Sequence, residues 1–444
     1  MQCVAVHRGP LEVGSLPRRL GAAGWSEAAA RYRRAAWHVY EIAPLEGAAA
    51  AELAGRAARL GAVARERAYA GRRAVTVGGP LERLEELAAE LAAAHPQLAA
   101  AGRALRVALL STAPASARGV PPEELPPVAR VPRTVPVRGR QLRFGERTLI
   151  MGVLNVTPDS FSDGGRYNTP DRAVRRALEM VQEGVDVIDV GAESANIAAS
   201  KPELEEELER LMPVVERLVR EVDVPISIDT YKAPVAEAAL QAGAHIINDI
   251  SGLHADPDLP AVCARYGAGV VIMHLQGHPR ALAREPVYED VILDIARYLQ
   301  EGVQNALAAG VAPERILVDP GIGVGKRTRH NLEVLENLHA FRSLGYPVLL
   351  GASRTSVIGN LLETPVGDRL EGTLATTVLA AVHGADMVRV HDIRANARAA
   401  RVADALTRGW REPEDGWPFD AVTGHQRRPL RELGRLPAPP GAGA

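Results

Sequence analysis

Three polar side chains lie where short apolar runs of the sequence end, and their types suit the recognition of a heterocycle. Asp229 ends the run PISID, Asn248 lies in HIINDI, and Asp319 lies in RILVDPG. Buried carboxylate and amide groups need N–H donors, and a carboxylate can accept a paired, amidine-like edge through both of its oxygens. These residues therefore predict a pocket for a flat heterocycle with an aminopyrimidinone edge.

Positively charged side chains and a candidate cation ligand follow other apolar runs. Arg389 and His391 lie in DMVRVHD, and Arg354 follows PVLLGAS. Such side chains suit phosphate or pyrophosphate, which a guanidinium binds through two parallel hydrogen bonds. Asn155 precedes an Asp- and Ser-rich segment, 156–165. This arrangement suits Mg2+, which takes few protein ligands and keeps several waters. The pattern predicts a cationic rim for a leaving anion beside the heterocycle pocket.

A shared ligand site accounts for these residues better than helix capping does. A single Asp at the end of a strand is often a helix N-cap, but here several strand candidates end in polar residues. Two other motifs are weaker candidates. GIGVGK (321–326) lacks the spacing of a phosphate-binding P-loop. HLQGH (274–278) is too short and loop-like for a zinc-binding helix, because His274 ends an expected strand and His278 precedes Pro279.

The elements that must position these residues repeat one unit. Apolar runs alternate with amphipathic stretches between residues 137 and 402, which predicts parallel strands buried on both faces with helices outside. Eight such units predict a (β/α)8 TIM barrel, whose active site lies where the strands meet the following loops. A doubly wound open sheet is the alternative, but its usual glycine-rich dinucleotide turn does not follow the first strand. The expected strands are 149–155, 186–194, 225–229, 245–250, 269–274, 315–321, 347–353 and 386–392, and four expected helices end at Gly184, Gly243, Gly310 and Gly384.

The chain divides into four zones by composition. Residues 1–112 predict a small α+β domain that carries no acid/base cluster and no phosphate loop, so a docking or stabilising role is favoured over a regulatory or partner-binding one. Residues 113–136 are rich in proline and predict a linker, because no helix or central strand tolerates that density. Residues 137–402 form the predicted barrel, and 403–444 a loose tail. In the first zone we expect strands at 35–45 and 72–79 and helices at 47–61 and 80–94.

Composition excludes several classes of protein. The 444 residues include 52 basic and 54 acidic side chains, a formal net charge of −2, so no basic surface for nucleic acid is expected. The two cysteines cannot form a disulfide framework, which suits a reducing cytoplasm. No apolar run approaches the roughly 18 residues of a membrane span, and the first residues lack the apolar core of a signal peptide. We expect a cytoplasmic protein without a membrane or nucleic-acid partner.

Several long segments, in one order, resemble the dihydropteroate synthase family. IMGVLNVTPDSFSDGG (150–165) closely resembles the first signature of that family, and VDVIDVGAES, PISIDTYKAPVAEAALQAGAHIINDISG, ILVDPGIGVGK and GASRTSVIG follow in register. The resemblance covers about residues 148–402, and residues 1–112 are similar to an extra domain found before the barrel in some bacterial members. It implies a TIM barrel that condenses 6-hydroxymethyl-7,8-dihydropterin diphosphate with 4-aminobenzoate. The products are dihydropteroate, for folate synthesis, and pyrophosphate.

The resemblance also implies roles for individual residues, Mg2+ as the metal, and a homodimer formed through outer helices. Asp229, Asn248, Asp319 and Arg389 would be the catalytic set. The residues matching the pterin site are Asp229, Asn248, Ile250, Met273, Asp319 and Arg389; those matching the diphosphate site are Asn155, Arg389 and His391; Ser356 matches the aminobenzoate site; and Asn155 matches the metal site.

Three departures from the family pattern fall on the second-substrate side. Thr355 replaces the lysine of the usual Ser-Arg-Lys-Ser motif, residues 195–198 replace the usual Thr-Arg-Pro-Gly, and Val324 replaces an aromatic residue. Two hypotheses follow: an active synthase with compensated substitutions, or a pterin-binding paralogue that lacks this activity or uses another nucleophile. A methyltetrahydrofolate-dependent methyltransferase is a third alternative, disfavoured because NVTPDSFSDGG and an SRxS motif are not expected in that class.

Overall fold

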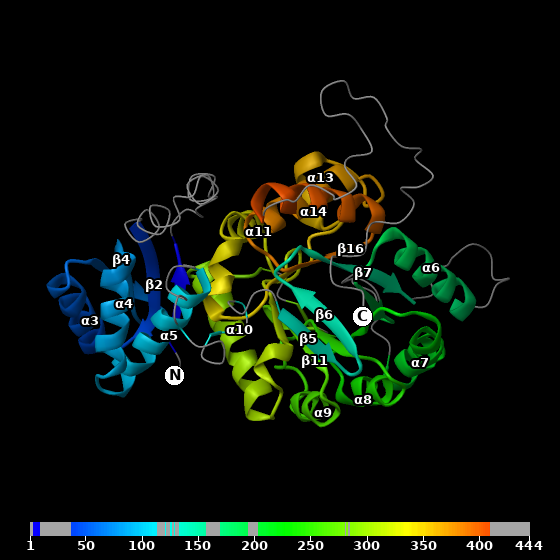
Figure 1. Ribbon diagram of the computed structural model, residues 1–444, viewed down its shortest axis with the longest axis horizontal. Coiled ribbons are helices and arrows are strands. Elements are labelled where there is room, and N and C mark those ends of the chain that lie inside the picture. The colour runs from blue at the N-terminus through cyan, green and yellow to red at the C-terminus, as the bar shows by residue number, and fades with distance from the viewer. Residues whose placement is uncertain are drawn as a thin grey trace, which may run out of the picture.

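The computed structural model describes residues 3–8, 37–112, 120, 125–126, 128, 133–156, 169–193, 203–279, 281–282 and 285–408. Within these ranges the chain forms a barrel and a smaller N-terminal domain beside it (Figure 1). The expected fold, a TIM barrel preceded by a small α+β domain, is confirmed. Among the described residues no helix combines the length and apolarity needed to span a membrane.

The barrel sheet contains eight parallel strands in the described part of the chain. Their order is β14-β11-β10-β9-β8-β7-β16-β15. A bridge between Val318 and Val348, with a hydrogen bond from Val318 N to Pro347 O of 2.9 Å, joins the two ends of this order into a closed ring. The strands are β7 (Leu149–Asn155), β8 (Val187–Gly191), β9 (Ile226–Asp229), β10 (Ile246–Asp249), β11 (Gly269–Met273), β14 (Ile316–Asp319), β15 (Leu349–Leu350) and β16 (Met387–Val390).

Helices surround this sheet and bury their apolar faces against it. The four glycines expected to end helices all adopt positive φ, the left-handed geometry of a helix C-cap. At Gly243 a side chain would also collide with Val219, because an added Cβ would lie 2.8 Å from its Cγ1. The helices are α6 (Thr169–Glu183), α7 (Leu204–Glu221), α8 (Ala233–Gln241), α9 (Leu259–Tyr266), α10 (Val291–Ala308), α11 (Thr328–Glu336), α12 (Ser356–Leu362), α13 (Leu370–Val382) and α14 (Ile393–Thr407), with 3-10 turns η3 (Pro313–Arg315) and η4 (Leu338–Leu344).

A short antiparallel hairpin closes one end of the barrel (Figure 1). It consists of β5 (Arg133–Val137) and β6 (Arg140–Phe144). Val135, Val137, Leu142 and Phe144 pack on buried side chains from seven barrel strands. Residues 133–136, expected as the end of the linker, are therefore part of a strand; Pro136 is tolerated because a two-stranded ribbon leaves one edge of each strand unpaired. At the other end of the barrel domain, α14 continues to Thr407, past the expected boundary at 402.

The N-terminal domain is a four-stranded antiparallel sheet of order β1-β2-β4-β3 covered by helices. Strands β2 (Trp37–Leu45) and β4 (Arg72–Pro80) and helices α3 (Gly47–Arg59) and α4 (Leu81–Ala92) lie where the sequence predicts them. Strands β1 (Val4–His7) and β3 (Val63–Tyr69) and helix α5 (Pro96–Thr112) were not expected. The charges of VARERAY hide β3, and β1 has only four residues.

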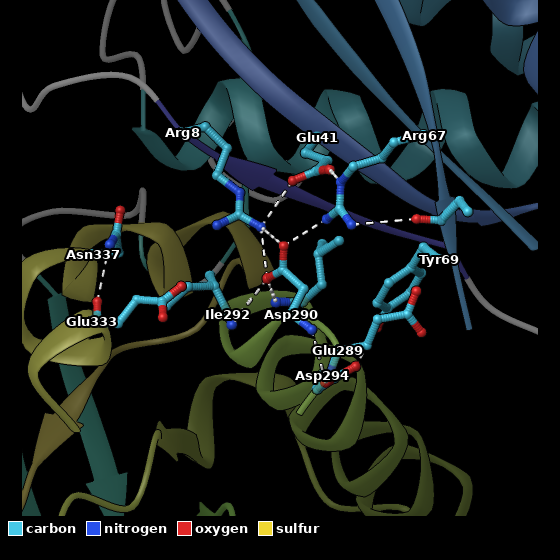
Figure 2. Close-up of polar contacts among 12 residues, drawn as sticks. Arg8, Glu41, Arg67, Tyr69, Glu289, Asp290, Ile292, Asp294, Glu333 and Asn337 are labelled. Carbon is cyan, nitrogen blue, oxygen red and sulfur yellow. Dashed lines mark hydrogen bonds and ion pairs between the residues drawn. The ribbon is translucent and has the colours of Figure 1, made fainter. Parts of the chain in front are cut away.

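This domain packs directly on the barrel. Strand β1 and helix α5 contact η4, and β1 also contacts α10. The N–H of His7 donates a 3.0 Å hydrogen bond to Ser343 Oγ in η4. In Figure 1 the domain, coloured blue to cyan, lies beside α10. A second set of contacts, shown in Figure 2, joins the domain to the start of α10.

Candidate active site

The strand register brings the predicted residues to one level at the carboxyl ends of four neighbouring strands. Asn155 of β7 pairs with Gly191 of β8, Gly191 pairs with Asp229 of β9, and Asp229 pairs with Asn248 of β10. Gly191 leaves room for its neighbour, because a Cβ added there would lie 3.4 Å from the Cβ of Asp229. The barrel thus collects residues that are far apart in the sequence at a single mouth.

Asp189 of β8, which was not among the predicted site residues, joins Asn248 to Arg389. One oxygen, Oδ2, accepts hydrogen bonds from Nδ2 of Asn248 at 3.0 Å and from Nε of Arg389 at 2.6 Å. Asp189 is fully buried, and its Oδ1 has no hydrogen-bond partner among the described residues. The motif VDVIDVGAES contained the signal, since an Asp inside a buried strand needs a partner.

Arg389 of β16 connects this group to Asp229. Its Nη2 donates to Asp229 Oδ2 at 2.7 Å, and its own side chain is only 22% exposed. Burial raises the pKa of Asp229; Arg389 opposes this effect and Asp189 adds to it. Asp189, Asp229, Asn248 and Arg389 are called the mouth cluster below. The structure ties Arg389 to carboxylates of the pocket, whereas the sequence had suggested a place on a cationic rim.

Asp319 of β14 lies on the opposite side of β15 from Arg389. A Cβ added at Gly351 would lie 3.5 Å from Asp319 Oδ2 and 3.9 Å from the Cβ of Arg389, so both residues flank this glycine. The N–H of Gly321 donates to Asp319 Oδ1 at 2.7 Å. Burial raises the pKa of Asp319 to about 6, against the lowering effect of that hydrogen bond.

Met273 and Ile250 supply apolar surface near these polar groups. Met273 ends β11, pairs in register with Asp319 and is buried. Ile250 directly follows β10 and is half-buried. Their positions at strand ends fit the expected contact with a flat ring.

His391 and Arg354 differ from the simple cationic rim that the sequence suggested. His391 Nδ1 lies 2.9 Å from Ser353 Oγ, and burial lowers its pKa to about 4, assisted by Arg389. The imidazole is therefore neutral near pH 7. Arg354 forms two hydrogen bonds with Asp392, at 3.0 and 2.7 Å. The rim thus combines a neutral histidine with an arginine already paired to a carboxylate.

The turn after β15 places Thr355 and Ser356 beside the loop 321–326. Ser356 is exposed and begins α12. The Thr355 hydroxyl donates to Ala352 O at 2.9 Å, and its Cγ2 would lie 2.9 Å from a Cβ added at Gly323. Thr355 therefore packs against the loop that also carries Val324. Residues 195–198, the third departure from the family pattern, lie outside the described residues.

A half-buried lysine, Lys326, organises the loop 321–326. Lys326 Nζ lies 2.9 Å from His274 Nδ1 and donates to Gly321 O at 2.7 Å. Burial lowers the pKa of Lys326 to about 7 and is the main cause that lowers the pKa of His274 well below its ordinary value.

In the described part of the chain, no group of three or more His, Cys, Asp or Glu could hold a metal ion.

A second ion-pair group lies next to the mouth and was not expected. Lys232, just after β9, contacts Glu193 at 3.6 Å and pairs closely with Glu207 of α7. The Tyr231 hydroxyl lies 3.3 Å from Glu193 Oε2. These contacts fix Glu193, the last described residue before 195–198 in the sequence.

Comparisons with known proteins identify the family of this chain. The family model described as pterin binding enzyme matches residues 151–391, so the chain belongs to the pterin-binding enzyme family. Its relatives in that family include dihydropteroate synthase of Clostridium beijerinckii, 45% identical over 273 residues, which cover 61% of this chain and 99% of that protein. The expected family and transferase class are thus confirmed.

Solved structures give the same result. Dihydropteroate synthase from Clostridium difficile, solved in the presence of pteroic acid, is 47% identical, with a TM-score of 0.57 over 60% of this chain and 98% of that one. The enzyme from Xanthomonas albilineans in complex with 7,8-dihydropteroate is 39% identical, with a TM-score of 0.56 over 62% and 98%. These matches cover the barrel's share of the chain.

Proposed function

We propose that this chain is a dihydropteroate synthase that joins 6-hydroxymethyl-7,8-dihydropterin diphosphate to 4-aminobenzoate. The observation that carries the proposal is the mouth cluster, with Asp319 across Gly351 from Arg389. This arrangement offers carboxylate and amide acceptors to the N–H donors of a pterin ring. The relative solved with 7,8-dihydropteroate supports the same product.

The reaction asks for charge placement more than for a strong base. The bond between the pterin methylene carbon and the diphosphate oxygen breaks, and pyrophosphate leaves with the electron pair. The aminobenzoate nitrogen then forms a bond to that carbon and loses a proton. Asp229, Asn248 and Asp319 would hold the ring, and its buried surroundings exclude water from the cation-like methylene. Arg389 would stabilise the departing charge.

Magnesium is part of the proposal because the residues present fit the way that this ion binds. Asn155 offers one amide oxygen at the mouth, and Mg2+ commonly takes few protein oxygens together with substrate phosphates and water. Bound there with the diphosphate, it would neutralise charge on the leaving group. His391, held by Ser353, would contact the same diphosphate.

Ser356 is the proposed contact of the aminobenzoate carboxylate, because it is exposed at the start of α12. The alternative function, a pterin-binding paralogue without synthase activity, rests on Thr355. Its hydroxyl is bonded to Ala352 O, and threonine has neither the charge nor the reach of the usual lysine.

We also propose a cytoplasmic homodimer. The outer face of α13 and α14 leaves Val378, Val402 and Leu406 exposed by 38%, 63% and 76%. A self-complementary pairing of such faces is typical of two-fold dimers. Cys3 and Cys263 are both free and buried, which suits a reducing compartment.

The test is turnover by the full chain with Mg2+, the pterin diphosphate and 4-aminobenzoate. Pyrophosphate release that depends on aminobenzoate supports the synthase, and Asp229→Asn should lower it by about 100-fold or more. Pterin binding in calorimetry without turnover would instead support the paralogue. A large gain in turnover for Thr355→Lys would show that threonine limits this reaction. If the chain bound no pterin at all, both functions would be rejected.

A further inference from the structure

The N-terminal domain binds the start of α10 through a compact group of ion pairs (Figure 2). Arg8 Nη2 lies 2.8 Å from both oxygens of Asp290 and 2.8 Å from Glu41 Oε2. Arg67 bonds Glu41 through Nε at 2.6 Å and Asp290 through Nη2. Arg8, Glu41, Arg67 and Asp290 are called the interface cluster below. Both arginines of the N-terminal domain therefore converge on one barrel residue, Asp290.

Asp290 is also the N-cap of α10. Its Oδ1 accepts hydrogen bonds from the N–H groups of Ile292 and Leu293, at 3.1 and 3.0 Å. Burial alone would raise the pKa of this carboxyl, but Arg8, Arg67 and those N–H groups hold it below its ordinary value. One carboxylate thus fixes the domain and the start of the helix to each other.

Neighbouring contacts fix the segment on both sides of Asp290. The Tyr69 hydroxyl donates to Asp294 Oδ1 at 2.7 Å. The N–H of Ala70 donates to Glu289 Oε2 at 2.6 Å. The turn that precedes α10 is therefore bound to the N-terminal domain through both side chains and backbone.

The same turn reaches the mouth of the barrel two residues before Asp290. The Tyr288 hydroxyl donates to Gly325 O at 2.6 Å, inside the loop 321–326. The Tyr288 ring lies 5.9 Å from that of His274, centroid to centroid. On another side Gly325 packs closely on the backbone of Gln276, since an added Cβ would lie 2.9 Å from its N atom.

The loop 321–326 in turn holds Asp319. Gly321 donates its N–H to that carboxylate, and Lys326 bonds both Gly321 O and His274. A continuous set of contacts therefore runs from Arg8 and Arg67 through Asp290 and Tyr288 to the loop beside Asp319. Such a set can carry a shift at one end to the other.

We infer that Arg8 and Arg67 of the N-terminal domain are positioning residues for the pterin pocket, acting through Asp290 and Tyr288 on the loop 321–326. The inference rests on the proposed synthase function for its kinetic consequences only. It gives the N-terminal domain a role in the reaction beyond docking. Loss of the ion pairs between these arginines and Asp290 should make the loop 321–326 more mobile and weaken pterin binding. No group that contacts the substrate would be removed.

The experiment compares the wild-type chain with the double variant Arg8→Ala/Arg67→Ala. Hydrogen exchange of peptides that contain 321–326 should become faster. The affinity for 6-hydroxymethylpterin, measured by calorimetry, should fall roughly three- to tenfold, and KM for the pterin diphosphate should rise more than kcat falls. Arg8→Lys/Arg67→Lys should restore part of the affinity, because it keeps both charges.

A second variant protects the test from a folding failure. Tyr288→Phe keeps the ring and removes only the hydrogen bond to Gly325 O, and it should produce the same exchange and affinity changes. Combined with the double variant, the effects should be less than additive, since both act in one chain of contacts. Arg72→Ala is the matched control, because Arg72 pairs with Glu46 inside the N-terminal domain; it should change neither readout.

One outcome would contradict the inference. If the double variant lowers Tm while exchange at 321–326 and pterin affinity match the wild type, the domain only docks and the inference is wrong. The exchange measurement needs no turnover. A chain without synthase activity would therefore reject the proposed function while still deciding this inference.

Discussion

The mouth cluster and the interface cluster both combine carboxylates with arginine, but in different numbers. In the interface cluster two arginines face two carboxylates, and every carboxylate there has an arginine partner. In the mouth cluster one arginine serves both Asp189 and Asp229, and Asp319 lies nearby. The mouth cluster therefore has two carboxyl groups for one arginine, whereas the interface cluster has two for two.

The titration behaviour of the two clusters follows this difference. The pKa of Asp290 is held below its ordinary value by two arginines, whereas the pKa of Asp229 is raised by burial with one arginine in opposition. In the interface cluster every carboxylate has an arginine partner, and the cluster joins the two domains. In the mouth cluster the carboxyl groups outnumber the arginine, so carboxyl oxygens remain to accept hydrogen bonds from a ligand, as a binding site requires.

The largest expected effect comes from removing Arg389, the arginine of the mouth cluster. Arg389→Leu leaves Asp189 and Asp229 buried without their partner, so the free energy of unfolding should fall by about 3 kcal/mol. Synthase turnover should fall by about 100-fold or more, because the charge that stabilises the leaving group is lost. Denaturant titration and a pyrophosphate-release assay measure the two effects. Unchanged stability would show that the mouth charges are not coupled.

Proton release is the next test, because raised pKa values of pocket carboxyls predict it. Pterin N–H donors favour ionised acceptors, so binding should release protons near pH 6, where Asp319 is partly protonated in the free protein. Affinity should accordingly increase from pH 5 to pH 7. Calorimetry in buffers of different ionisation heat counts the protons. Proton uptake over this range would contradict the assignment of Asp319 as an acceptor.

Asp189→Asn sharpens the comparison by reducing the imbalance without removing a partner. The Asp189 charge raises the pKa of Asp229, so its loss should lower that pKa. Carboxyl titration followed by NMR would detect the change. Serine at 227, next in register to Asp189, offers a neighbouring control position: Ser227→Ala should leave the Asp229 titration in place.

The smallest effect is expected in the balanced cluster. Glu41→Gln leaves both arginines on Asp290, and Arg67 is 36% exposed to screening solvent. The free energy of unfolding should fall by about 1 kcal/mol or less, and more at low salt than at high salt. Pterin affinity should stay unchanged. A decrease in the free energy of unfolding as large as that expected for Arg389→Leu would contradict the difference proposed between the two clusters.

The sequence predicted the barrel because its evidence was local. Long apolar runs mark the buried strands, and glycines mark the helix ends. Asp229, Asn248 and Asp319 could be predicted as site residues because each lies at or next to the end of such a run. In a barrel of parallel strands the carboxyl ends of all strands lie at one end, so residues at these sequence positions could be predicted to form one site.

The parts that sequence did not predict depend on contacts between distant residues. Asp189 looked like one polar residue within a strand, and its importance lies in partners on β10 and β16. The bond between Arg8 and Asp290 spans 282 positions. The hairpin β5–β6 was hidden because its first strand ends a proline-rich stretch, and only packing against the barrel end shows its place.

The shared oxygen of Asp189 has a consequence for the lifetime of the pocket. Because it links β10 to β16, and Arg389 extends the link to β9, no one of these strands can leave without disrupting the others. The acceptors are already arranged before any ligand arrives, so binding needs little rearrangement. The pocket should open on the slow timescale of global unfolding rather than by local fraying.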